Sequence, residues 1–278
     1  MHNLKDIRKN LEIFKKQISN RNTNIDFDEL ILLDKKNRDL IQKKEGLEQE
    51  KKILSKEKNE NNFKKSKIIS NDIDNLNLEQ FKYKLKIEKI LSILPNIALP
   101  DVPVGKDEKS NKIIKTEGKI RDFKFNIKSH VELGEINDQV DFKTSSKLSG
   151  SRFVVLKDKY ALLERALINF MLDIHTIRFN YKEISPPLIV NEDIMFGTGQ
   201  LPKFEDDQFE IKLEKTDTRK FLIPTAEVVL TNFFRETLLN AKDLPIRLVA
   251  ATPCFRKEAG SYGKDTKGLM RQHQFYKV

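Results

Sequence analysis

The chain has 278 residues, of which 38% are hydrophobic and 34% are charged, and its formal net charge is +10. No run of about 18 apolar residues occurs, so we expect no membrane-spanning helix, and the N-terminal segment lacks the apolar core of a secretory signal. The single cysteine, Cys254, excludes an internal disulfide framework and a multi-cysteine zinc site, and it favours a reducing, cytoplasmic environment. The positive charge is compatible with a polyanionic partner.

The first third of the chain is predicted to be helical, because residues 1–94 contain one glycine and no proline. One apolar seam has a leucine every seven residues: Leu33, Leu40, Leu47 and Leu54. A second seam alternates spacings of four and three: Ile69, Ile73, Leu76, Gln80, Tyr83, Ile87, Ile90 and Leu94. A polar segment separates them. This pattern predicts an antiparallel helical hairpin over about residues 27–94, with helices beginning near Phe27 and Lys67. The alternative is one continuous helix that dimerises in parallel.

The tip of this predicted hairpin is basic. Residues 51–67 carry two glutamates and seven lysines, a net charge of +5: Lys51, Lys52, Lys56, Lys58, Lys64, Lys65 and Lys67. A narrow arm with a positive end suits a phosphate backbone, although a solvated surface would have the same composition.

A proline-rich linker follows the hairpin. Three prolines between residues 95 and 103 prevent helix and favour an extended path. We therefore divide the chain into residues 1–104, an N-terminal domain with the arm, and residues 105–278, which have a mixed pattern of strands and helices. The fold class is α+β.

Within the second part, residues 158–179 are predicted to form a helix with a broad apolar face. The strand-like run after it is interrupted by Pro186 and Pro187, which is typical of an edge or an interface.

A threonine and a carboxylate precede a predicted helical run from Val228 to Leu239. Thr225 and Glu227 are two residues apart, so together they could hold an ammonium group and a hydroxyl group. The alternative is a helix start, in which Thr225 caps the helix and Glu227 favours its dipole.

Two strands joined by a polar loop are predicted for residues 247–278. Arg256 and Glu258 would share one face of the first strand, and Arg271 and Phe275 one face of the return strand. Two arginines, a carboxylate and a ring can hold a nucleotide, and an ordinary hairpin with ion pairs is the alternative. Two other side chains here are predicted to be structural, Cys254 as a small buried residue and His273 through hydrogen bonds, and the histidines are too widely spaced for a metal site.

Several long stretches carry a resemblance to a known family. They are PNIALPDVPVGKDE, SGSRFVVLKDKYALLERALINFMLDIHT, GTGQLPKF, LIPTAE and TPCFRKEAGSYGKDTKGLMRQHQFYKV. In order and length they resemble the seryl-tRNA synthetase family of bacterial type, which belongs to class II. FRKE with GLMRQHQF resembles the second class II motif, and the helix that leads to Pro186 and Pro187 resembles the first, which forms the dimer interface in that family.

The resemblance implies ATP-dependent attachment of L-serine to tRNA(Ser) through a seryl-adenylate, with Mg²⁺ bridging the phosphates, and it leaves tRNA(Sec) open as a second substrate. It implies that the serine-binding residues are Thr225, Ala226 and Glu227. It implies that the ATP-binding residues are Arg256, Lys257, Glu258, Arg271, Gln272 and Phe275. Arg256 would be catalytic at the α-phosphate, Glu258 would accept from the adenine amino group, and Phe275 would stack on the base. Arg271 would meet the distal phosphate, and the backbone near Gln272 would contact the base.

For the arm, the resemblance implies a tRNA-binding domain that grips the long variable arm of the tRNA through Lys51, Lys52, Lys56, Lys58, Lys64 and Lys65. It also implies a homodimer and an antiparallel class II sheet. Asn180 and Val229 depart from the family, which has glycine and proline there. The family's third motif and its magnesium-binding acid have no counterpart here, so we expect a C-terminally truncated synthetase, inactive alone and without a metal ligand. The other hypotheses are a paralogue that loads an amino acid on a carrier protein and a non-catalytic tRNA-binding coiled-coil fragment.

Overall fold

The structure, a computed structural model, describes residues 2–23, 25–56, 59–213, 218–259 and 268–278. The chain divides into two compact units, residues 1–119 and 120–278. The predicted boundary at residue 104 stays a prediction, since the residues on either side of it are extended apart from one short 3-10 turn, η1 (Glu108–Ser110).

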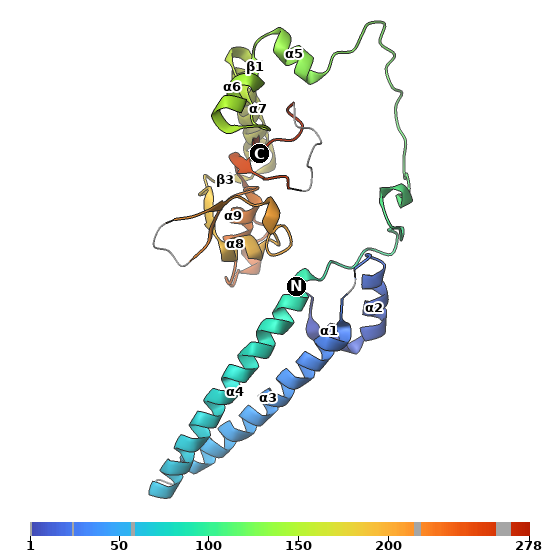
Figure 1. Cartoon of the computed structure of the whole chain (residues 1–278). Helices are drawn as coiled ribbons and strands as arrows, with labels where there is room; N and C mark the ends of the chain where they lie inside the picture. The colour runs from blue at the N-terminus through green and yellow to red at the C-terminus, as the bar shows by residue number, and fades with distance from the viewer. Residues whose placement is uncertain (1, 24, 57–58, 214–217, 260–267) are drawn as a thin grey trace. The chain divides into compact units, whose positions relative to one another are not determined.

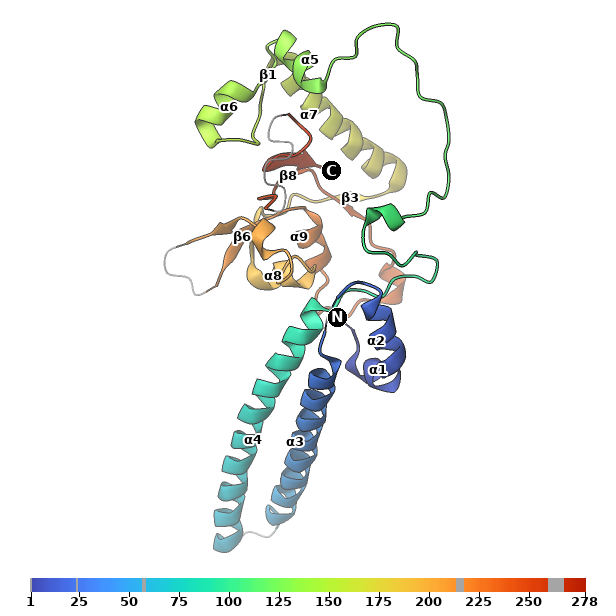
Figure 2. The same cartoon turned by 45° about the vertical axis from the view of Figure 1, so that its right-hand side comes forward.

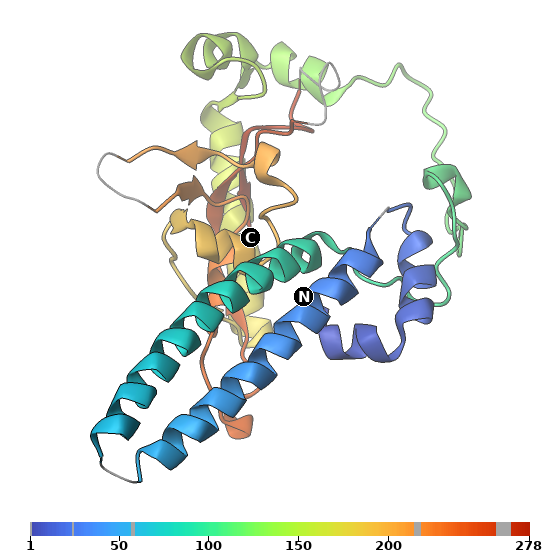
Figure 3. The ribbon, with the colours of Figure 1, turned by 60° about the horizontal axis from the view of Figure 1, so that its bottom comes forward.

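The first unit is helical and contains the predicted hairpin. Two short helices, α1 (Leu4–Lys9) and α2 (Leu11–Ser19), precede the long helices α3 (Phe27–Leu54) and α4 (Glu60–Ile93). Helices α3 and α4 lie side by side along the arm, as Figures 1 and 3 show, so the chain turns back after Leu54 and does not continue as one helix. The seam residues named above are buried or half-buried along the length of the arm.

The two long helices begin where side chains cap them. Helix α3 begins at Phe27 as predicted, because the Asp26 carboxylate accepts from the backbone N–H of Glu29 at 2.9 Å. Helix α4 begins at Glu60, before the predicted start at Lys67. Here the side chain of Asn59 accepts from the N–H of Asn62 at 2.8 Å. A polar segment without glycine or proline can form exposed helix, so polarity alone did not mark the end of the turn.

The base of the arm holds the core of the first unit. Nine buried apolar residues from all four helices and the residue after α4 form one cluster: Ile7, Phe14, Ile18, Phe27, Leu30, Leu33, Ile87, Leu91 and Leu94. Beside them the Asp34 carboxylate is buried, with 3% of its side chain exposed. It accepts from Arg8 Nη1 at 2.8 and 3.0 Å and from Arg38 Nε at 3.0 Å, which ties α1 to α3.

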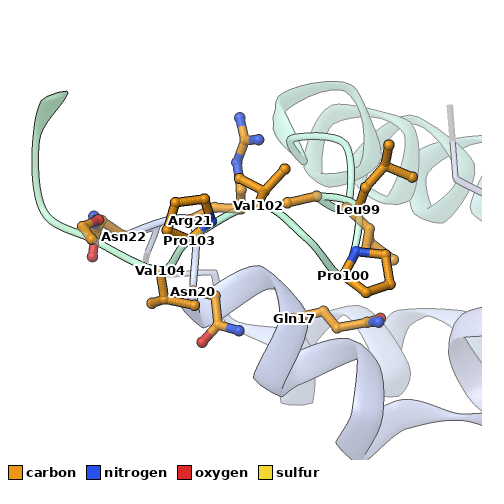
Figure 4. A pocket seen from close by; sticks show the side chains of 12 residues that line it. Gln17, Asn20, Arg21, Asn22, Leu99, Pro100, Val102, Pro103 and Val104 are labelled. Atoms are coloured by element: carbon orange, nitrogen blue, oxygen red, sulfur yellow. The ribbon is translucent and has the colours of Figure 1, made fainter. Parts of the chain in front are cut away.

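The proline-rich linker contains no helix, as predicted, and is extended apart from a turn in which the N–H of Val102 donates to the carbonyl of Leu99; it packs on α2. Together they enclose a cavity of about 390 Å³, in which Pro100 and Pro103 lie opposite Gln17 and Asn20 (Figure 4). The side-chain amide of Asn22 donates to the carbonyl of Gly105 at 2.8 Å and holds the end of this segment.

The second unit combines short helices with short strands (Figure 2). Its helical segments are α5 (His130–Ile136), α6 (Phe142–Ser149), α7 (Asp158–Asp173), the π-helical turn η2 (Ile174–Arg178), α8 (Glu192–Gly197), η3 (Glu205–Asp207), α9 (Glu227–Asn232) and η4 (Ala241–Asp243). Its strands are β1 (Val140–Asp141), β2 (Val155–Leu156), β3 (Lys182–Glu183), β4 (Ile189–Asn191), β5 (Glu210–Ile211), β6 (Lys220–Leu222), β7 (Leu248–Val249), β8 (Thr252–Phe255) and β9 (Gln274–Lys277).

The strand pairs are mainly antiparallel, which confirms the α+β class. The antiparallel pairings are β1 with β2, β6 with both β4 and β5, and β8 with β9. Strands β3 and β7 pair in parallel, unlike the expected antiparallel pattern. The connection between them contains α8 and α9 and is long enough for a parallel crossover.

The predicted amphipathic helix is α7, continued by η2. Its apolar face is exposed in the described chain: Leu162, Leu163, Leu167 and Phe170 are 54, 52, 48 and 59% exposed. After η2, Asn180 has φ of +58°, in the left-handed region. Asparagine tolerates this conformation, so it can stand here in place of the family's glycine. The proline pair then separates β3 from β4.

Candidate functional site

The segment that leads into α9 brings the predicted serine-binding residues to one place. Thr225 is 6% exposed, and its Oγ1 accepts from Lys277 Nζ at 3.1 Å. The N-cap of α9 is Ala226, without a side-chain cap, so the alternative in which Thr225 caps the helix is wrong. Glu227 lies in the first turn, where its charge also favours the helix dipole. The helix ends at Asn232, short of the predicted Leu239.

These three residues open into a cavity of about 380 Å³. Its other walls come from η2, β7 and β9: the lining residues include His175, Tyr181, Leu248, Val249, Ala250, Lys277 and Val278. A small cavity with a buried hydroxyl and a carboxylate can hold a small ligand that carries an ammonium group.

Sequence reasoning did not assign Lys277 to this site. Residues two apart on a strand share a face, and Lys277 follows Phe275 by two on β9. The alternation of β9 could therefore have placed Lys277 with Phe275 in advance.

Strands β8 and β9 form the predicted hairpin, with Cys254 opposite Phe275. Arg256 lies just beyond β8 and its backbone N–H donates to the carbonyl of His273 at 2.9 Å. The guanidinium carbon of Arg256 is 5.3 Å from the centroid of the Phe275 ring. Its Nε donates to the carbonyl of Pro224 at 3.4 Å, so Arg256 joins the hairpin to the residue before Thr225.

Glu258 departs from the strand geometry expected for it. Its φ is +51°, so it does not continue β8, and the argument that it shares a strand face with Arg256 is wrong. Its carboxylate is 3.8 Å from Arg271 Nε, and its carbonyl accepts from Arg152 Nη1 at 3.3 Å. The structure thus brings Glu258 and Arg271 together, in the ion pair that the alternative of a plain hairpin also requires. Lys257 is exposed, with Nζ 5.9 Å from the centroid of the Phe209 ring.

Two further side chains of the hairpin, Cys254 and His273, have structural surroundings, as predicted. Cys254 is fully buried. The ring of His273 lies 5.3 Å from that of Phe153 and 6.0 Å from that of Phe209, and its Nδ1 bonds to the carbonyl of Arg256 at 2.9 Å. Gln272 is half-buried beside it. Across the described residues, no group of three or more histidine, cysteine, aspartate or glutamate side chains could hold a metal ion.

The predicted tRNA-binding lysines lie near the tip of the arm. Lys51 and Lys52 are in the last turn of α3, Lys56 follows it, and Lys64 and Lys65 are in the first turns of α4. Lys64 pairs with Glu60 at 2.9 Å, and all but Lys51 are exposed. Lys58 lies outside the described residues.

None of the helices that the structure describes is long and apolar enough to cross a membrane.

Two family models match the parts of the chain that form the arm and the site. The seryl-tRNA synthetase N-terminal domain matches residues 1–98, and the tRNA synthetase class II core domain (G, H, P, S and T) matches residues 208–278. The first match covers α1 to α4, and the second covers Thr225 to Glu227 and the β8–β9 hairpin.

Whole proteins are similar to the chain along its length. The serine–tRNA ligase of Pelagibacter ubique is 58% identical over 278 residues, which are 100% of this chain and 66% of that protein. The serine–tRNA ligase of Ehrlichia canis is 46% identical, again with 66% of its length covered. The chain therefore spans slightly less than two thirds of the length of these curated relatives.

Solved structures agree with the sequences. Seryl-tRNA synthetase from Pyrococcus horikoshii, complexed with ATP, is 34% identical with a TM-score of 0.84, over 100% of this chain and 68% of that one. The cytoplasmic serine–tRNA ligase from Naegleria fowleri, in complex with AMP, is 27% identical with a TM-score of 0.78, over 96% of this chain and 62% of that one. Family models, relatives and structures thus converge, and the chain belongs to the seryl-tRNA synthetase family.

Proposed function

We propose that the protein activates L-serine with ATP and transfers the seryl group to tRNA(Ser). The observation that carries this proposal is the position of Arg256. Its ring contact with Phe275 and its bond to the carbonyl of Pro224 connect the β8–β9 hairpin to the segment that leads into the cavity beside Thr225, which supports a joint site for ATP and serine. The relatives' names and the ATP and AMP of the solved structures support this assignment.

In the first step, an oxygen of the serine carboxylate attacks the α-phosphorus of ATP. A phosphorus–oxygen bond forms to serine, the bond to the β-phosphate oxygen breaks, and pyrophosphate leaves with the electron pair. The carboxylate is ionised at neutral pH, so the step needs alignment and charge neutralisation rather than a strong base. Arg256 supplies the positive charge at the α-phosphate.

The other side chains hold the two substrates. Glu227 pairs with the serine ammonium group, and the Thr225 hydroxyl, already bonded to Lys277, belongs to the polar wall of the cavity. A site that hydrogen-bonds the serine hydroxyl discriminates against alanine, which would leave buried polar groups unpaired. On the hairpin, Phe275 stacks on adenine, Glu258 accepts from its amino group and Arg271 meets the distal phosphate. Lys257 and the backbone at Gln272 complete the nucleotide contacts.

Mg²⁺ would enter the site bound to the phosphates of ATP. No carboxylate cluster among the described residues fits it, and the steps above need none of this chain's residues as its ligands.

In the second step, the oxygen of the terminal ribose hydroxyl of the tRNA attacks the seryl carbonyl carbon and forms an ester bond. The bond between that carbon and the phosphate oxygen breaks, AMP leaves with the electron pair, and the hydroxyl proton passes to the phosphate or to solvent. The lysines at the tip of the arm bind the tRNA backbone without reading its sequence. Charging of tRNA(Sec) is an extension of the same reaction.

We also place a homodimer interface on the exposed apolar face of α7 and the region of Pro186 and Pro187. The four apolar side chains given above are each about half exposed there, and a second copy of the chain would cover them.

Aminoacylation of tRNA(Ser) with radiolabelled serine tests the function, in the protein extended to the length of its relatives. The variant Arg256→Ala should charge about 10² to 10³ times more slowly, because one charge-stabilising group is lost at the reacting phosphate. Arg235→Ala, which removes an arginine paired with Asp193 away from the cavity, is the control and should charge normally. Normal charging by Arg256→Ala would contradict the proposal.

A further inference from the structure

One acidic residue far from the hairpin in sequence binds the backbone on both sides of Glu258. The carbonyl of Asp207 accepts from the N–H of Lys257 at 2.8 Å, and Asp207 Oδ1 accepts from the N–H of Ala259, also at 2.8 Å. Between these two bonds Glu258 has φ of +51°. A non-glycine residue keeps this left-handed conformation only when its surroundings enforce it.

Asp207 is itself held in place. It ends the 3-10 turn η3, and its N–H donates to the carbonyl of Phe204 at 3.1 Å. At the start of the same turn, the Glu205 carboxylate pairs with Arg219 Nη2. The turn therefore has a fixed connection to β6, which carries Phe221 and continues to Thr225.

Arg219 connects η3 to two further elements. Its Nη1 pairs with Glu192 at 2.9 Å, and its Nε and Nη2 bind both oxygens of Glu210 at 3.0 and 2.9 Å. These hydrogen bonds raise the pKa of Arg219 above its usual value, and the guanidinium lowers the pKa of Glu210. A guanidinium shared by three carboxylates fixes their relative positions, so the turn η3 that carries Asp207 is held in place.

We propose that Asp207 is a positioning residue for nucleotide recognition: it holds the backbone of Glu258 in the left-handed conformation, so that the Glu258 carboxylate faces the adenine amino group beside Arg271. This inference rests on the proposed function, in which Glu258 recognises adenine. Without the bond to Ala259, the backbone at Glu258 relaxes toward φ below zero, and its carboxylate turns away from Arg271.

Three variants of the full chain test the proposal. Asp207→Ala removes the acceptor for Ala259 and keeps the backbone carbonyl that binds Lys257. Asp207→Asn keeps an oxygen at the same place and removes only the charge, so it should restore the bond. Asp206→Ala is the matched control, because Asp206 is the exposed neighbour in the same turn.

We call the two hydrogen bonds of Asp207 to Lys257 and Ala259 the clamp. Two measurements separate the clamp itself from its effect on nucleotide recognition. Amide hydrogen exchange followed by NMR reports the bond directly: exchange at Ala259 should be at least about tenfold faster in Asp207→Ala, with little change at Lys257. Isothermal titration with ATP and GTP reports recognition. Asp207→Ala should bind ATP about tenfold more weakly and lose its preference for ATP over GTP, whose base presents a carbonyl in place of the amino group. Asp207→Asn and Asp206→Ala should resemble the original chain both in hydrogen exchange at Ala259 and in nucleotide binding.

Unchanged exchange at Ala259 in Asp207→Ala would overturn the proposal, as would an equal loss of protection in Asp206→Ala. Failure of Asp207→Asn to restore protection would also overturn it, because a charge effect rather than the bond would then be responsible. Faster exchange at Ala259 with an unchanged preference for ATP would uphold the clamp and contradict the assignment of Glu258 to adenine. If the protein at the length of its relatives binds neither nucleotide while exchange responds as expected, the hydrogen bonds of Asp207 stand and the proposed function fails.

Discussion

Arg256 and Phe275 face each other across the β8–β9 hairpin, with the guanidinium carbon 5.3 Å from the ring centroid. The cation lies over one face of the ring. In the proposed function the same ring also stacks on adenine.

Replacement of Phe275 should weaken ATP binding selectively. Base–aromatic stacking contributes about 1–3 kcal/mol, so Phe275→Leu should raise the KM for ATP by about 5- to 150-fold and leave the KM for serine within about twofold. Tyr276→Leu is the control, because Tyr276 points to the opposite face of the strand and is 49% exposed. Equal effects of both variants in pyrophosphate exchange would contradict the stacking role.

Loss of the Asp34 carboxylate should destabilise the first unit. Asp34→Ala leaves Arg8 and Arg38 without their shared buried partner, and the free energy of unfolding in urea should fall by about 3 kcal/mol. Asp28→Ala removes a carboxylate that pairs with Lys15 at 2.9 Å but is 87% exposed, so it should cost less than about 1 kcal/mol. Similar losses in the free energy of unfolding for the two variants would show that burial of Asp34 does not determine how much its ion pairs stabilise the unit.

The Asp141 carboxylate makes stability depend on pH at the start of α6. Hydrogen bonds from the backbone N–H and hydroxyl of Thr144, with a smaller effect of Lys157, lower the pKa of Asp141 to about 2. Its ordinary value is about 3.9, so its contribution is complete above pH of about 4 and is lost as the pH falls through about 2. The stability difference between the original chain and Asp141→Asn should shrink over this range. A difference that is constant between pH 5 and 2 would contradict the lowered pKa.

Charge reversal at the tip of the arm should weaken tRNA binding. Changing Lys51, Lys52, Lys56 and Lys58 to glutamate should reduce the slope of log K against log salt by about 3 to 4 units if all four contact phosphates. The control reverses four lysines that follow the proline-rich linker, Lys106, Lys109, Lys112 and Lys119, and so changes the net charge equally. Serine-dependent pyrophosphate exchange should be unaffected by either set. Equal slopes in the two variants would indicate a general charge effect and a tip that is only solvated.

Local signals in the sequence predicted the elements that depend on neighbouring residues. The heptad leucines and the absence of proline place α3 correctly at Phe27, and the apolar face of α7 is equally clear. The start of α4 at Glu60 was missed because polar residues are compatible with both a turn and an exposed helix. Beyond Asn232 the apolar residues of the stretch 233–239 continue a helix-compatible pattern, so periodicity could not show that α9 ends there.

Contacts distant in sequence could not be predicted from the hairpin alone. The bond from Ala259 to Asp207 spans 52 residues, and the bond from Lys277 to Thr225 spans the same interval. The left-handed backbone of Glu258 depends on the first of these bonds. The alternation of a strand therefore wrongly predicted that Glu258 shares a face with Arg256. The residue types of the site were evident in the sequence, whereas their orientation depends on the tertiary contacts of η3 and α9.

The most direct test of the account separates the amino-acid cavity from the nucleotide hairpin. Serine-dependent ATP–pyrophosphate exchange is measured in the protein at the length of its relatives, for Thr225→Ala and Arg271→Ala. The account predicts that Thr225→Ala raises the KM for serine by about tenfold or more and leaves the KM for ATP unchanged, because one buried hydrogen-bonding group of the cavity is lost. Arg271→Ala should do the reverse. A rise in both constants with each variant, or exchange that does not depend on serine, would contradict the placement of the two substrates.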